Sequence, residues 1–246
     1  MAKYKKNFLN SVIIKIEFYD NLPINEELPQ GLIDIAIKNF PLFEPKPFIR
    51  KKYDFSNRGM KEAETFEGTN WIFHGKNREK SLTLEQAAVG IKYSKYSSFN
   101  DLKKEFFSVL DKISEMYPEA RISRSGLRYI NNIEFNEKNP LNWGKYLNTN
   151  LLAIFKVPQD KNTITRAFHN LELKYDDMNI RFQYGMPNPD YPSLIRKKSF
   201  ILDFDAYLSG EQEISKMPDQ VNKYHEKIEQ LFENSIKDDL REKMNE

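Results

Sequence analysis

Two arginines and two aspartates have the residue types and spacing to bind a charged ligand. Arg124, Gly126 and Arg128 occupy alternate positions of a segment that is typical of a strand, 121–131 (RISRSGLRYIN), and alternate residues of a strand share one face. Glycine lets a ligand approach the backbone, and each guanidinium can donate two parallel hydrogen bonds to a phosphate or carboxylate. The spacing predicts an anion site at these three residues.

Asp203 and Asp205 alternate with Leu202 and Phe204, which places the two carboxylates on one strand face roughly 7 Å apart. Such a pair can bind a metal ion or share acid–base work, but the nearby sequence supplies no further ligands. Two alternatives stay open. The arginines pair with these aspartates across neighbouring strands, or the aspartates are the polar outer face of a strand whose other face is core. Gly126 equally fits a bulge.

Other catalytic signatures do not occur in the sequence. The three histidines, His74, His169 and His225, lack any HExxH or HxxxH spacing, and neither a GxSxG elbow nor a nucleotide-binding glycine loop is present. The chain has no cysteine, which removes thiolate ligands and a cysteine nucleophile. We therefore expect no catalytic residue, no metal site and no cofactor.

The composition is typical of a folded protein, with 39% hydrophobic and 30% charged residues in 246, and a net charge of +2. That charge is far from the strongly basic balance of dedicated nucleic-acid binders. The densest basic runs, 50–52 and 196–198, are typical of solvated loops or strand ends. No run approaches the roughly 18 to 20 apolar residues of a membrane helix, and Lys15 and Glu17 interrupt the only candidate leader. These features indicate a cytoplasmic protein.

Hydrophobic periodicity predicts the same order of elements twice. The first half reads as a strand at 11–20, a helix at 31–40, strands at 48–55, 70–77 and 80–96, and a helix at 100–117 capped by Asn100. The segment 80–96 is either one strand or two strands divided near Gly90. The second half reads as a strand at 121–135, a helix at 143–155, strands at 165–175, 178–185 and 199–208, and a helix at 218–244. The junction at residues 119–120 is too short for independent domains.

The pattern thus predicts an α+β protein with one globular unit over residues 1–246. Two pseudo-repeats, at 11–118 and 121–244, each run strand, helix, three or four antiparallel strands and a long helix. We expect their sheets to be fused, with the long helices packed on one face. The strand at 121–135 would then open the second copy at the seam.

This element order resembles the half-repeat of the TATA-box-binding-protein fold and its helix-grip relatives. The chain also resembles a sporadically distributed prokaryotic family of uncharacterised proteins of about this length. The matching segments are NSVIIKIEF (10–18), SGLRYIN (125–131), ILDFD (201–205) and the last helix around His225, Phe232, Ile236 and LREKM (240–244). The resemblance implies a full-length single unit and transfers no chemistry, because one architecture serves DNA binding, lipid binding and catalysis.

We expect a non-enzymatic binding or interaction protein whose partner is another protein or a second copy of itself. One alternative is an enzyme or small-ligand binder that holds an anion with Arg124 and Arg128, together with Asp203 or Asp205. The other is a nucleic-acid-binding protein that uses a basic and aromatic sheet face including residues 50–52 and Tyr129.

Overall fold

The computed structural model describes residues 4–56 and 59–246, apart from the side chains of residues 50, 55 and 56. Within these residues the fold is α+β, as expected, and its nine strands follow the hydrogen-bonded order β2-β3-β4-β5-β1-β6-β9-β8-β7. The strands are β1 (Leu9–Phe18), β2 (Leu42–Ser56), β3 (Gly59–His74), β4 (Lys80–Glu85), β5 (Ala88–Tyr93), β6 (Ile122–Phe135), β7 (Ala167–Lys174), β8 (Asn179–Met186) and β9 (Lys198–Gln212). The α-helices are α1 (Gln30–Ile37), α2 (Phe99–Met116), α3 (Met217–Ser235) and α4 (Asp238–Asn245), with 3₁₀ helices η1 (Thr149–Lys156), η2 (Lys161–Thr163) and η3 (Ile214–Lys216).

The chain forms two compact units. Unit 1 comprises residues 1–12, 126–208 and 219–246, and unit 2 comprises residues 13–125 and 209–218. Each unit is described by itself.

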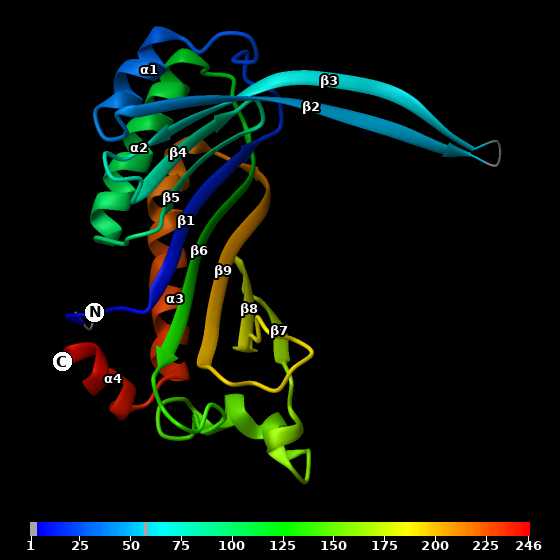
Figure 1. Cartoon of the computed structure of the whole chain (residues 1–246). Coiled ribbons are helices and arrows are strands. Elements are labelled where there is room, and N and C mark those ends of the chain that lie inside the picture. The colour runs from blue at the N-terminus through cyan, green and yellow to red at the C-terminus, as the bar shows by residue number, and fades with distance from the viewer. Residues whose placement is uncertain (1–3, 57–58) are drawn as a thin grey trace. The chain divides into compact units, whose positions relative to one another are not determined.

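In unit 2, helices α1 and α2 lie beside strands β4 and β5 (Figure 1). The stripe predicted for the second helix is buried at Leu102, Phe106, Val109, Leu110 and Ile113. It packs with alternate strand residues that are also buried, such as Leu82, Leu84, Val89 and Ile91. The helix begins one residue earlier than expected, and its cap is Ser98 rather than Asn100, because the Ser98 hydroxyl accepts a hydrogen bond from the Asp101 backbone N–H.

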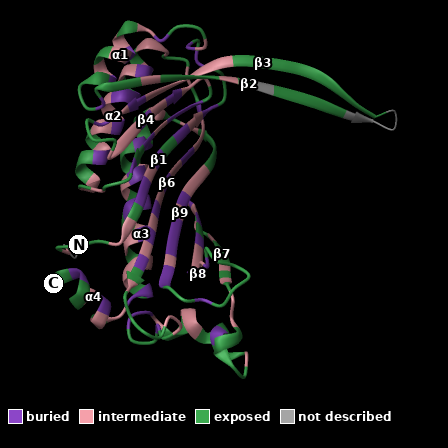
Figure 2. Cartoon of the chain, in the orientation of Figure 1, coloured by how far each residue is buried: buried purple, intermediate pink, exposed green. Residues whose placement is uncertain are grey.

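Strands β2 and β3 of unit 2 form a long two-stranded ribbon (Figure 1). Only Trp71–His74 of β3 pairs with β4, so residues 46–56 of β2 and 59–70 of β3 continue as a hairpin without a third strand. Figure 2 shows that the outer part of this ribbon is exposed on both strands. We refer to residues 42–56 and 59–74 as the ribbon.

In unit 1, the sheet runs β6-β9-β8-β7 and buries its apolar face under α3. The buried residues alternate along the strands as the period-two pattern predicts, and include Leu127, Tyr129, Ile133, Leu202, Phe204, Ile180 and Phe182. Val221, Tyr224 and Ile228 of α3 are buried as well.

The prediction of an α-helix at 143–155 is wrong. The chain makes turns after Trp143 and then the 3₁₀ helix η1, because backbone groups of Tyr146 and Asn148 bond to the end of α3 and interrupt a helical ladder. The N–H of Asn148 donates to Ser235 O at 2.9 Å, and the N–H of Lys237 donates to Tyr146 O at 2.8 Å.

The same contacts explain why the helix expected at 218–244 is two helices. Ile236 forms an antiparallel bridge with Leu147, and an extended bridge residue cannot continue a helix. The chain therefore leaves α3 at Ser235 and starts α4 at Asp238.

Candidate functional site

The predicted residues Arg128 and Asp203 form a bidentate ion pair in unit 1. Arg128 Nε donates to Asp203 Oδ1 at 2.8 Å, and Nη2 donates to Oδ2 at 2.6 Å. The Asp203 side chain is 10% exposed and that of Arg128 is 38% exposed. The hydrogen bonds to Asp203 raise the pKa of Arg128 above its ordinary value. This is the pairing that the sequence left open as an alternative to ligand binding.

The pair belongs to a row of alternating charges across the four strands of unit 1. Asp205 lies opposite Arg181 of β8, and Arg181 Nε donates to Glu172 Oε1 of β7 at 2.7 Å. This hydrogen bond lowers the pKa of Glu172 and raises that of Arg181. An added anion would have to displace a carboxylate that already accepts two hydrogen bonds from Arg128, which is costly for a bidentate pair.

Gly126 serves the contact between β6 and β9. A Cβ atom at this position would lie 3.3 Å from Ala206 O and 3.5 Å from the Cβ of Tyr207, so the space above the glycine is filled by β9. Arg124, the remaining predicted residue, belongs to unit 2 and has a half-buried side chain.

Tyr129, which the nucleic-acid alternative placed on an open sheet face, is buried. The residue is 6% exposed, and its hydroxyl lies 3.1 Å from His225 Nδ1. Lys51 and Lys52 of the same alternative form ion pairs with acids of β3, with Lys51 Nζ 3.0 Å from Glu62 and Lys52 Nζ 3.6 Å from Glu64. The side chain of residue 50 lies outside the described residues.

Sequence reasoning missed Lys198, which it placed in a solvated basic run. Its ammonium is buried and donates to Glu137 Oε2 at 2.7 Å and to Asn142 O. The rings of Trp143 and Tyr146 lie 5.1 and 5.2 Å from it, as in a cation–π cage. The only sequence signal was the pair of aromatic residues 55 and 52 positions upstream. Lys198 therefore attaches the segment after β6 to the start of β9.

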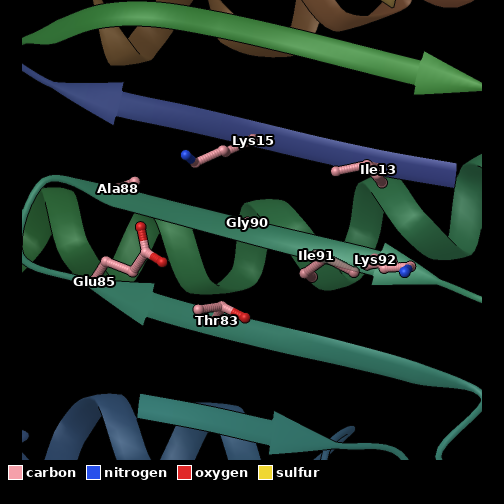
Figure 3. A pocket seen from close by; sticks show the side chains of 8 residues that line it. All are labelled: Ile13, Lys15, Thr83, Glu85, Ala88, Gly90, Ile91 and Lys92. Carbon is pink, nitrogen blue, oxygen red and sulfur yellow. The ribbon is translucent and has the colours of Figure 1, made fainter. Parts of the chain in front are cut away.

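A shallow hollow lies on unit 2, between β1, β5 and β4 (Figure 3). Its volume is about 180 Å³, below the roughly 300–1,000 Å³ of typical ligand pockets. Lys15, Glu85 and Lys92 line it around Gly90, and Lys15 pairs with Glu17 at 3.0 Å. The hollow offers both signs of charge and carries no assignment of function.

The ribbon presents apolar side chains to solvent. Ile49, Met60 and Phe66 are 66%, 62% and 49% exposed. The ribbon is fixed at its base, where Asn25 Nδ2 donates to Glu67 O at 3.1 Å and Trp71 Nε1 donates to Ile24 O at 2.6 Å. Beyond this base, the described side chains of β3 from Gly59 to Glu67 are all exposed.

The free edge of the ribbon's β2 strand is guarded against pairing with another strand. Pro45 and Pro47 of β2 lack an N–H group. The β2–β3 register shifts between Lys52 and Tyr53, because Ala63 of β3 has no Cα partner on β2. Prolines, lysines and bulges are the usual means of blocking an edge. The ribbon therefore offers its faces, not this edge, for contact.

In the part of the chain that the structure describes, no three His, Cys, Asp or Glu side chains gather as metal ligands would. No helix in the described residues is long and apolar enough to cross a bilayer.

Comparison with protein-family models finds no match to this chain, and comparison with curated proteins finds none either. Function is therefore inferred from geometry.

Proposed function

We propose that the protein is a non-enzymatic binding protein that contacts another protein through the faces of its ribbon. The observation that supports this is the exposure of Ile49, Met60 and Phe66 on a hairpin that has no third strand along residues 59–70. An isolated two-stranded hairpin is marginally stable in water, so covering these side chains on binding stabilises the ribbon.

The charges of the ribbon favour a protein over a nucleic acid. The cations of Lys51 and Lys52 lie against Glu62 and Glu64, so these two lysines do not present an uncompensated basic stripe to phosphates. Mixed charges around exposed apolar side chains are typical of a protein interface.

The test compares capture by the wild-type protein with capture by an Ile49→Ser/Phe66→Ser variant. Both positions are exposed, so the variant folds. The control is Ile37→Ser in α1, a residue 43% exposed outside the ribbon. Proteins retained from a lysate of the native host by the wild type and the control, but not by the ribbon variant, are purified, and their dissociation constants are measured.

A weakening of at least about tenfold, or 1.4 kcal/mol, by the ribbon variant alone is expected. Equal binding by all three proteins would overturn the proposal. Retention of nucleic acid that is lost with rising salt would favour the alternative instead.

We also propose that the chain arose by internal duplication of a unit that resembles half of the TATA-box-binding-protein fold. The order β1, α1, β2 to β5, α2 and the order β6, η1, β7 to β9, α3 support it. The two copies differ in strand number, and the second has a 3₁₀ helix where the first has α1. The measurable test is an experimental structure, in which residues 11–118 should superpose on residues 121–244 with β1 on β6 and α2 on α3.

A further inference from the structure

Strand β7 of unit 1 has a free edge. It is the last strand in the hydrogen-bonded order and pairs only with β8. At the hairpin between them, the N–H of Tyr175 donates to Met178 O at 2.8 Å. Because hydrogen-bonded and non-hydrogen-bonded pairs alternate along an antiparallel ladder, this bond fixes which residues of β7 face β8.

The outward-facing residues of β7 follow from that alternation. His169, Leu171 and Leu173 bond to β8, so the peptide groups with unused donors and acceptors are those of Phe168, Asn170, Glu172 and Lys174. Among the described residues, no group forms a hydrogen bond with these backbone N–H and C=O groups. The edge thus offers four N–H and four C=O groups in a row.

The two terminal strands differ in how their edges are protected. Strand β2 carries Pro45 and Pro47 and pairs with a bulge at Ala63 of β3, whereas β7 (AFHNLELK) has no proline and pairs with β8 in unbroken register. Phe168 and Leu171 are 49% and 47% exposed. A regular edge strand with exposed apolar side chains is a template for another strand.

We propose that β7 is a self-association surface, on which β7 of a second copy pairs antiparallel about a two-fold axis at Leu171. The outward residues run from 168 to 174, and only an axis at 171 pairs all four of them with outward residues of the second copy. Each strand then satisfies its free groups, giving about eight backbone hydrogen bonds in the interface. A two-fold axis makes the contact closed and self-complementary.

Charge supports the same register. It places Asn170 opposite Glu172 of the second copy, Phe168 opposite Lys174, His169 opposite Leu173, and Leu171 opposite itself, so no like charges meet. A shift that moves the axis to Glu172 would place two carboxylates opposite each other, which is destabilising. Glu172 is already held by Arg181 at 2.7 Å and by Asn170 at 3.3 Å, which orders this edge.

Single cysteines test the pairing, because the natural chain has none. Across the axis, the two Cα atoms of residue 171 would be about 4.5 Å apart, as in a non-hydrogen-bonded pair, and this lies within the range that a disulfide spans. Leu171→Cys is expected to form a covalent dimer under mild oxidation. Leu173→Cys lies on the same face of β7, but its two copies would be about 14 Å apart and should not link.

Phe66→Cys, of nearly the same exposure on the ribbon, is the control for random collision. Sedimentation equilibrium of the unmodified protein is expected to show twice 29.2 kDa, and Leu171→Lys should shift it to the monomer by opposing two ammonium groups. Circular dichroism verifies that each variant is folded.

A wild-type protein that stays monomeric up to about 200 µM would refute the proposal, since typical specific dimers associate well below that concentration. Linking of Leu173→Cys as fast as Leu171→Cys would refute the register, and preferential linking of Phe66→Cys would move the contact to the ribbon. The inference concerns a surface separate from the ribbon. Loss of partner capture by the ribbon variant therefore does not affect the proposal of a β7 dimer. A monomeric wild-type protein likewise does not affect the proposal that the ribbon binds a partner.

Discussion

Within the described residues, the buried charges of Asp203 and Lys198 are paired with side chains of the protein itself. Arg128 holds Asp203 through two hydrogen bonds, and Lys198 holds Glu137 inside an aromatic cage. Sequence spacing identified the first pair of residues as candidates, because alternation places them on one face of each strand. It could not identify Lys198, because its partners Glu137 and Trp143 are distant in sequence and approach only through the turns after β6.

Lys198→Met tests the role of the buried ammonium. The change keeps the apolar stem but leaves Asn142 O and Glu137 Oε2 without the ammonium donor, so we expect the free energy of unfolding to fall by about 1–3 kcal/mol. Urea unfolding measures the loss. The exposed neighbour Lys197 provides the control, since Lys197→Met should change stability by less than about 0.5 kcal/mol.

The pH dependence distinguishes an ionic role from simple packing. The hydrogen bond from Lys198 holds the pKa of Glu137 below its ordinary value of 4.5, so this carboxylate contributes stability above that value. The contribution is lost as pH falls through the lowered folded-state pKa. The difference in stability between wild type and Lys198→Met should therefore narrow in acid, and the NMR titration of Glu137 should shift upward in the variant. A difference that is constant with pH would contradict the ionic role.

At the scale of elements, the local hydrophobic pattern predicted α2 and the strands of unit 1 but failed at 143–155, where backbone groups bond to the end of α3. The buried stripe of α2 and the alternation of β6 and β9 follow from periods of 3.6 and 2 residues. The segment at 143–155 has a helical apolar pattern, yet its peptide groups bond to residues near Ser235. A contact across more than eighty residues has no signature in a local window.

Asn148→Ala tests that contact. The Asn148 side chain accepts from the Asn150 N–H at 3.0 Å at the start of η1 and donates to Asn234 O at 2.9 Å. Removing both bonds is expected to lower stability by about 0.5–2 kcal/mol, the usual cost of losing a cap. Asn148→Asp keeps the acceptor and should recover part of the loss, whereas Asn150→Ala should have little effect. Thermal unfolding that ranks these variants in another order would exclude this role.

At the scale of the whole molecule, composition and pattern were enough to predict the α+β class and most strand positions. They could not predict the ribbon's length, because a hairpin exposed on both faces has no continuous apolar side to reveal it. Pro45 and Pro47 did carry a signal for an edge strand. The expected anion site depended on side-chain direction, and the structure instead shows Arg128 satisfied by Asp203. The single unit over 1–246 and the two pseudo-repeats stay predictions.

Self-association through β7 would also link the stability of the whole molecule to its concentration. A dimer that forms only from folded chains gains stability by mass action, so each tenfold rise in concentration adds about 0.7 kcal/mol per protomer, half of the roughly 1.4 kcal/mol per tenfold for the dimer. For a chain of this length that corresponds to a rise in melting temperature of roughly 2 °C. Calorimetry across a hundredfold range should therefore show a rise of roughly 4 °C for the wild type and for Phe66→Lys, and none for Leu171→Lys. The ribbon control matters because Phe66 and Leu171 are almost equally exposed, so a loss of the concentration dependence in both variants would point to general hydrophobic association rather than to strand pairing at β7.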